Sequence, residues 1–105
     1  MNRSDKLYLE AQKTMPGGVN SPVRSFKGMG ISPEFITEGL GCHITSEDGH
    51  KYIDYIGAYG PLILGHCHPR VIAAIREASL KGTAYGTPTA LEVRMAEKIT
   101  SFISS

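Results

Sequence analysis

The chain has 105 residues, a mass of 11.4 kDa and a formal net charge of +1. This length favours a single domain and excludes a large self-contained enzyme. Apolar residues make up 41% and charged residues 20%, which is ordinary globular usage and not the composition of a disordered chain. The near-neutral charge argues against nucleic acid or an acidic membrane surface as a partner.

Cysteine usage and the start of the chain indicate the compartment. Cys42 and Cys67 are too far apart for a disulfide framework or a zinc knuckle, so we expect reduced thiols. The first 13 residues contain Asp5 and Glu10 and lack the apolar core of a signal peptide. The longest apolar run, at residues 62–64, is far below the roughly 20 residues that span a bilayer. We therefore expect a soluble, cytoplasmic protein.

A helix is predicted near the start, followed by a long irregular segment. Ser4 suits the N-cap of a helix over residues 5–14, in which Leu7, Tyr8 and Ala11 share one face. Residues 16–33 hold four glycines and three prolines and no sustained period. Loops of this length are usually functional or disordered.

Three short strands are predicted in the middle of the chain. Residues 34–38, 42–46 and 51–55 are rich in β-branched and aromatic side chains, and Asp48-Gly49 is a strong hairpin turn. These patterns predict a three-stranded antiparallel meander. A second glycine-rich loop follows over residues 56–69.

Two helices are predicted after this loop. The first, over residues 69–81, begins with a proline at its first position and ends before Gly82. The second begins with a capping box formed by Thr89 and Glu92. It is still amphipathic at Ile103 and reaches the end of the sequence without a stop signal, so we expect the chain to be part of a larger protein.

The run His66-Cys67-His68 contains residue types that bind transition metals. Adjacent residues on one loop rarely satisfy tetrahedral geometry, and no CxxC spacing accompanies them. We therefore expect a tight turn at Gly65-His66, with His68 capping the following helix, and no metal site.

Ser21 and Arg24 are candidate ligands for a carboxylate. Pro22 favours extended or polyproline-II geometry, in which positions three apart face the same way. A guanidinium beside a hydroxyl then offers two parallel charged hydrogen bonds and a third from the serine. An arginine that simply faces solvent is the commoner outcome on chemistry alone.

Tyr59 is a packing aromatic or a stacking surface for a planar ligand, and the pattern does not separate these interpretations. No Ser/His/Asp order, carboxylate pair or activated cysteine indicates a catalytic residue in the chain. The glycine-rich stretches lack the spacing of known phosphate-binding loops. Chemistry alone therefore predicts a soluble α+β unit with ligand-like loops.

Three ordered blocks resemble a known family: MPGGVNSPVRSFKG at 15–28, DGHKYIDYIGAYGPLILGHCHP at 48–69 and YGTPTALEVRMAEKI at 85–99. The chain resembles the N-terminal part of the glutamate-1-semialdehyde 2,1-aminomutases, within the class-III aminotransferases. The resemblance implies an α+β segment of a larger α/β fold-type-I pyridoxal-phosphate transferase. Residues 1–55 would form the helix, substrate loop and small sheet, and residues 56–105 would lead into the cofactor domain.

The resemblance also implies an activity. Such enzymes are homodimers that convert glutamate 1-semialdehyde to 5-aminolevulinate for tetrapyrrole synthesis, using pyridoxal or pyridoxamine 5'-phosphate as the electron sink. None of the chain's lysines matches the cofactor lysine, so the segment alone would be inactive and most cofactor contacts would lie beyond Ser105.

The resemblance also assigns roles to individual residues of this chain by their positions in the matching motifs. Ser21 and Arg24 match the substrate-carboxylate site, and Tyr59 stands where many relatives have a tryptophan in the active-site wall. Gly86 and Thr87 resemble a loop at the edge of the active site. Two alternatives stay open: a related class-III omega-aminotransferase that needs a separate amino donor, and a stand-alone binding or scaffold module.

Overall fold

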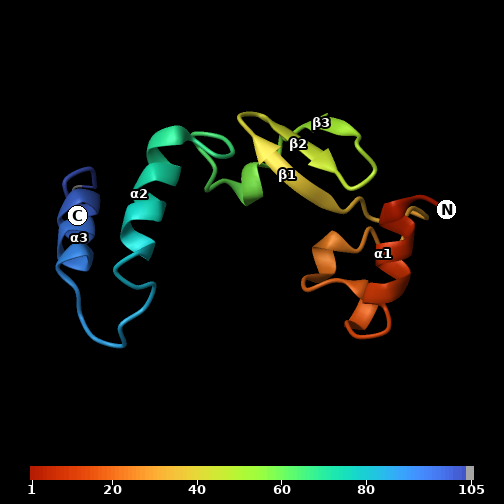
Figure 1. Cartoon of the computed structure of the whole chain (residues 1–105), viewed down its shortest axis with the longest axis horizontal. Helices are drawn as coiled ribbons and strands as arrows, with labels where there is room; N and C mark the ends of the chain where they lie inside the picture. Colours follow the sequence, from red (N-terminus) through yellow and green to blue (C-terminus); the bar gives the residue numbers. More distant parts are fainter. Residues whose placement is uncertain (104–105) are drawn as a thin grey trace. The chain divides into compact units, whose positions relative to one another are not determined.

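The computed structural model describes residues 1–103, which divide into two compact units, Met1–Val71 and the part from Ile72 onward (Figure 1). The helices and strands in chain order are α1 (Arg3–Ala11), β1 (Ile36–Leu40), β2 (His43–Ser46), β3 (Lys51–Ile53), α2 (Pro69–Ser79) and α3 (Ala90–Thr100). The expected helix, three strands and two helices are all present. No helix within residues 1–103 has the length and apolar character that crossing a membrane requires.

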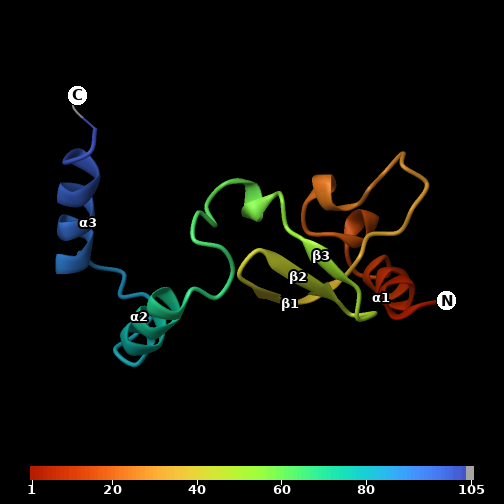
Figure 2. The same cartoon turned by 90° about the horizontal axis from the view of Figure 1, so that it is seen from above.

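The three strands form the predicted antiparallel meander in the order β1-β2-β3 (Figure 2). Asp48 and Gly49 lie in the β2–β3 turn, where Gly49 has a φ of 81° and donates its N–H to the Ser46 carbonyl at 2.9 Å. β1 starts at Ile36, two residues later than predicted. Phe35 is only half paired with the sheet, because its carbonyl accepts from the Glu47 N–H at 2.7 Å while its N–H donates to the Ser4 hydroxyl at 3.2 Å.

The N-cap of α1 is Asn2, so the prediction of Ser4 was wrong. The Asn2 side chain accepts from the Asp5 N–H at 2.7 Å, and the Asp5 carboxylate accepts from the Asn2 N–H, which together make a capping box. Ser4 lies inside the first turn and is buried. The helix also ends at Ala11 and not at residue 14, because the following residues make tighter three-residue turns.

The β2–β3 turn is fastened to the start of α1 through Asp48. Its two carboxylate oxygens accept from the backbone N–H of Arg3 at 2.6 Å and of Ser4 at 3.0 Å. These are N–H groups that a helix leaves without internal partners, and a negative charge is favourable at this end of a helix. Hydrogen bonding from the Ser4 side chain, then from the two backbone amides, lowers the pKa of Asp48. One carboxylate therefore joins the helix to the sheet.

Within residues 1–103, no large apolar side chain is buried: the buried residues are Ala11, Gly18, Pro33, Ser4, Ser25 and Ser46. Many large apolar side chains are exposed, among them Leu40, Tyr55, Ile63 and Leu80. The elements are therefore held mainly by caps, turns and strand pairing. Exposed apolar area of this extent is typical of surfaces that contact other protein.

In the second unit, the predicted capping box at the start of α3 is confirmed. The Thr89 hydroxyl accepts from the Glu92 N–H at 3.4 Å, and the Glu92 carboxylate accepts from the Thr89 N–H at 2.5 Å. The bonds from the Thr89 backbone and side chain lower the pKa of Glu92.

Candidate functional site

Ser21 and Arg24 lie on one tight turn. Ser21 is extended, with φ −144° and ψ 130°, and Pro22–Arg24 form a short 3-10 helix, η2. The expected polyproline-II geometry was therefore wrong for residues 22–24, because the fixed φ of proline also suits the first position of a helical turn. A 3-10 helix too has three residues per turn, so positions three apart are on the same side. Consistent with this, the Arg24 N–H donates to the Ser21 carbonyl at 3.0 Å.

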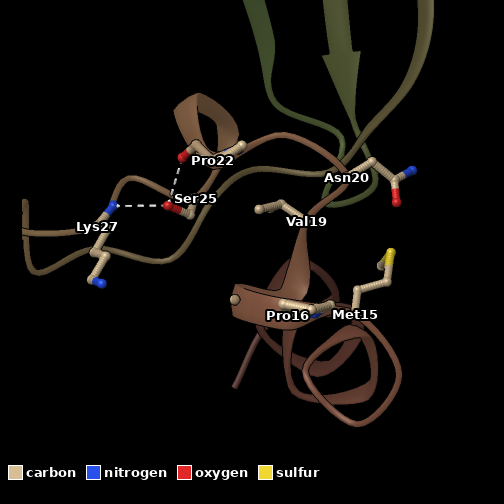
Figure 3. A pocket seen from close by; sticks show the side chains of 8 residues that line it. Met15, Pro16, Val19, Asn20, Pro22, Ser25 and Lys27 are labelled. Atoms are coloured by element: carbon tan, nitrogen blue, oxygen red, sulfur yellow. Dashed lines mark hydrogen bonds between the residues drawn. The ribbon is translucent and has the colours of Figure 1, made fainter.

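Ser25 fixes the base of this turn, a role that the sequence did not reveal. Its hydroxyl donates to the Pro22 carbonyl at 2.8 Å and accepts from the Lys27 N–H at 3.3 Å, as the dashed lines in Figure 3 show. Ser25 is buried, whereas Arg24 is exposed. The turn thus has a fastened base and an arginine that faces outward.

Two hollows flank the same segment. One, of about 560 Å³, is lined by Met15, Pro16, Gly17, Val19, Asn20, Pro22, Ser25 and Lys27 (Figure 3). The other, of about 390 Å³, is lined by Arg24 together with Glu34, Phe35 and their neighbours. The Glu34 carboxylate lies 3.8 Å from the His50 ring, and Arg24 makes no ion pair with an acidic side chain of residues 1–103. The guanidinium is therefore available to an external anion.

Tyr59 lies on a left-handed turn of the second glycine-rich loop. Gly57, Ala58, Tyr59 and Gly60 have φ values of 53°, 53°, 64° and 112°. For Ala58 and Tyr59 this geometry costs about 1–2 kcal/mol each, so surrounding contacts must hold it. Tyr59 is 68% exposed. Within the described residues it is thus presented outward, as a stacking surface requires, and it makes no hydrogen bond with Ser21 or Arg24.

Asp54 holds the residues just before this turn. One carboxylate oxygen, Oδ1, accepts from the backbone N–H of Ile56 at 2.9 Å and of Gly57 at 3.0 Å. The other, Oδ2, lies 2.7 Å from His66 Nε2. The bond from His66 first, and the amides of Gly57 and Ile56 next, lower the pKa of Asp54. Asp54 is therefore an ionised acceptor at neutral pH, and Nε2 of His66 donates to it.

His66 is in turn held by the sheet. Its N–H and carbonyl pair with the carbonyl and N–H of Gly41 at 2.8 and 2.9 Å. The ring lies against Gly39, where an added Cβ would be 2.6 Å from His66 Cγ. A Cβ added at Gly65, which has a φ of 74°, would likewise lie 2.6 Å from the Gly41 carbonyl oxygen. The turn expected at Gly65-His66 lies slightly earlier, because the Gly65 N–H donates to the Leu62 carbonyl at 3.0 Å and His66 forms the bridge to Gly41. Through this bridge the loop closes on the end of the β1–β2 hairpin.

The predicted helix cap by His68 is wrong. Its Nδ1 atom is buried and has no hydrogen-bond partner, so the ring does not satisfy the free N–H groups of α2 through this atom. No group of three or more His, Cys, Asp or Glu side chains within residues 1–103 has a geometry that could hold a metal ion.

Gly86 and Thr87 lie in the second unit and line a hollow of about 1200 Å³. Tyr85 and Leu91 line it as well. Lys81, another lining residue, has its amine 3.4 Å from the Glu77 carboxylate, and both side chains are exposed. The hollow is open and largely apolar, and its lysine, Lys81, is paired with an acidic side chain.

Comparison with known proteins identifies the family. Residues 27–104 match the model of the class-III aminotransferases. The chain belongs to this family. It is 52% identical over 105 residues to a glutamate-1-semialdehyde 2,1-aminomutase from Legionella pneumophila, covering all of this chain and 24% of that protein. This class-III aminotransferase chain thus spans about a quarter of the length of the curated relatives it matches.

Solved structures agree on the fold. An omega-transaminase from Sphaerobacter thermophilus matches 95% of this chain and 22% of its own, with a TM-score of 0.85 and 28% identity. A glutamate-1-semialdehyde-aminomutase from Pseudomonas aeruginosa PAO1, solved also with PMP, matches 94% and 22%, with a TM-score of 0.81 and 23% identity. The expected fold class, an α+β segment of a larger fold-type-I transferase, is confirmed. The fold alone does not separate aminomutases from transaminases.

Proposed function

We propose that this chain is the N-terminal part of an aminomutase that converts glutamate 1-semialdehyde to 5-aminolevulinate in porphyrin biosynthesis. The observation that carries the proposal is the 52% identity over the whole chain to a relative of that name. The full-length protein would act as a cytoplasmic homodimer. The exposed apolar side chains support contact with further protein, and the net charge of +1 gives no reason to expect nucleic acid or membrane as a partner.

Ser21 and Arg24 would bind a carboxylate of the substrate. Three observations support this role: both residues lie on one 3-10 turn, buried Ser25 fixes the base of that turn, and the Arg24 guanidinium has no acidic partner in residues 1–103. A guanidinium offers two parallel N–H groups to a carboxylate, and the Ser21 hydroxyl on the same side offers one more.

Tyr59 would form part of the active-site wall, and Gly86 and Thr87 would lie at its edge. The outward side chain of Tyr59 on a strained turn supports the first assignment, and the hollow beside Thr87 supports the second. We also propose the division into residues 1–55, for the substrate loop and small sheet, and residues 56–105, for the connection to a cofactor domain.

The cofactor would be pyridoxal or pyridoxamine 5'-phosphate. Lys81, beside the hollow at Thr87, is exposed and its amine lies 3.4 Å from the Glu77 carboxylate, so nothing around it favours it as the lysine that holds the cofactor. The chemistry at the cofactor would therefore belong mainly to residues outside this segment.

The substrate role of Arg24 is tested by substitution in the full-length protein. Arg24→Lys keeps the charge and loses the two-pronged hydrogen bond, so we expect KM for glutamate 1-semialdehyde to rise about 10- to 100-fold with a smaller change in kcat. Lys27→Ala is the matched control, because Lys27 contributes only its backbone N–H to the turn. An unchanged KM in Arg24→Lys contradicts the assignment.

A second candidate is a class-III omega-aminotransferase, favoured by the TM-score of 0.85 to an enzyme of that kind. This candidate requires a separate amino donor, whereas an aminomutase returns an amino group to the same carbon skeleton. Product formation from glutamate 1-semialdehyde without any donor distinguishes the two.

A further inference from the structure

Asp54 and His66 fasten the two ends of the loop that carries Tyr59. We propose that Asp54 and His66 are positioning residues, which hold Tyr59 in the orientation in which it contacts the substrate. The inference rests on the proposed function, since it assumes that Tyr59 contacts the substrate, and it adds two residues that touch neither substrate nor cofactor.

The first argument concerns the start of the loop. Asp54 Oδ1 accepts from the amides of Ile56 and Gly57, the two residues that lead directly into the left-handed turn. Four consecutive residues of that turn have positive φ, and two of them are not glycine. A backbone of this kind persists only where neighbouring groups hold it. The carboxylate is the side chain that does so in the described residues.

The second argument concerns the end of the loop. His66 is bound to Gly41 through both backbone groups, and its ring occupies the space left by Gly39. The Nε2–Oδ2 contact of 2.7 Å then links this fixed point on the sheet to Asp54, twelve residues earlier. The side chains of Asp54 and His66 are only 10% and 23% exposed. Both ends of the loop are thus tied to one another and to the sheet, while Tyr59 projects between them.

Hydrogen exchange of the full-length holoenzyme tests the Asp54–His66 link independently of enzyme activity. We expect Asp54→Ala to raise the exchange rate in a peptide spanning residues 54–66 by about tenfold or more, because the Ile56 and Gly57 amides lose their acceptor. Asp54→Asn should give an intermediate rate, because its side-chain oxygen can still accept from both amides whereas its NH2 group cannot accept from His66 Nε2–H. An unchanged rate in Asp54→Ala overturns the proposal.

Steady-state kinetics tests whether the link acts through Tyr59. We expect His66→Ala and Tyr59→Ala to raise KM for glutamate 1-semialdehyde by similar factors with a smaller change in kcat, and the double variant to be no worse than Tyr59→Ala. His66→Gln, whose side-chain amide can replace the Nε2–H donor, should restore most of the loss. His43→Ala, in the same sheet and outside the link, is the control and should leave both constants unchanged.

The outcomes separate the two proposals. Additive effects of His66→Ala and Tyr59→Ala, or a lowered thermal stability with unchanged KM, overturn the positioning role. If the unsubstituted protein forms no 5-aminolevulinate, the proposed function fails and the substrate role of Tyr59 fails with it. Hydrogen exchange then still decides whether Asp54 holds the turn.

Discussion

Replacing Gly39 by alanine should loosen the contact between the sheet and the loop that carries Tyr59. Among the chain's twelve glycines, Gly39 is the one without a positive φ, so the substitution brings no backbone strain. Its new methyl group would lie 2.6 Å from Cγ and 2.7 Å from Nδ1 of His66. The effect of this change is therefore steric and falls on one ring.

The magnitude follows from two opposing effects. The ring must move by about 0.8 Å to reach an ordinary contact of 3.4 Å, and adding a methylene to a filled site costs about 1–3 kcal/mol. Against this, alanine in a strand loses less chain entropy on folding than glycine, which contributes about 0.5–1 kcal/mol. The steric cost is the larger effect over most of these ranges, so we expect net local destabilisation of up to about 2.5 kcal/mol.

Native-state hydrogen exchange of the full-length protein measures this quantity locally. The reporters are the Gly41 and His66 amides, which bond across the bridge at 2.9 and 2.8 Å. The matched control is Gly39→Ala in a His66→Ala background, where the ring atoms are gone and the tight contact of 3.1 Å to Cβ of residue 66 is left, so the substitution should be much less destabilising. Equal destabilisation in both backgrounds refutes the steric reasoning.

Two further changes test other contacts. Because the folded pKa of Asp48 is lowered, its carboxylate stabilises the docking of α1 above its ordinary pKa of about 4, and this contribution is lost as pH falls through the lowered value. Thermal melts should thus be flat between about pH 5 and 8 and fall below about pH 4. Asp54 and Glu92 also have lowered pKa values and add to this acid-side slope, so Asp48→Asn should reduce the slope without abolishing it; an unaltered slope contradicts the role. Thr89→Ala should destabilise the start of α3 by about 0.5–2 kcal/mol, measured by amide exchange in its first turn, while Thr89→Ser keeps the cap; equal exchange in the two variants contradicts it.

Local signals in the sequence predicted much of the fold. The capping box of α3 and the Asp48-Gly49 hairpin depend on residues within a few positions of one another, and the strand pattern depends on side-chain type. The N-cap of α1 was misplaced because Asn2 and Ser4 are both good caps. What decides between them is Asp48, whose bond to the Ser4 N–H spans 44 positions of the sequence.

The candidate site was predicted less completely. Proline fixes its own φ but not its ψ, and ψ is the angle that separates polyproline II from a 3-10 turn. The Ser25 hydroxyl stabilises the 3-10 turn by donating to the Pro22 carbonyl. The Asp54–His66 link joins residues twelve positions apart and has no period to reveal it. The glycine at position 39, which leaves room for the ring, was an available signal. The roles of Ser21, Arg24 and Tyr59 toward a substrate stay predictions.

The most direct test of the central claim is to incubate the full-length protein with glutamate 1-semialdehyde in the absence of any added amino donor and to quantify 5-aminolevulinate. The aminomutase proposal predicts product at a rate that an added amino donor does not raise, and a rise in KM when Arg24 is replaced by lysine. Product that forms only when a donor amino acid is supplied contradicts the proposal and favours an omega-aminotransferase.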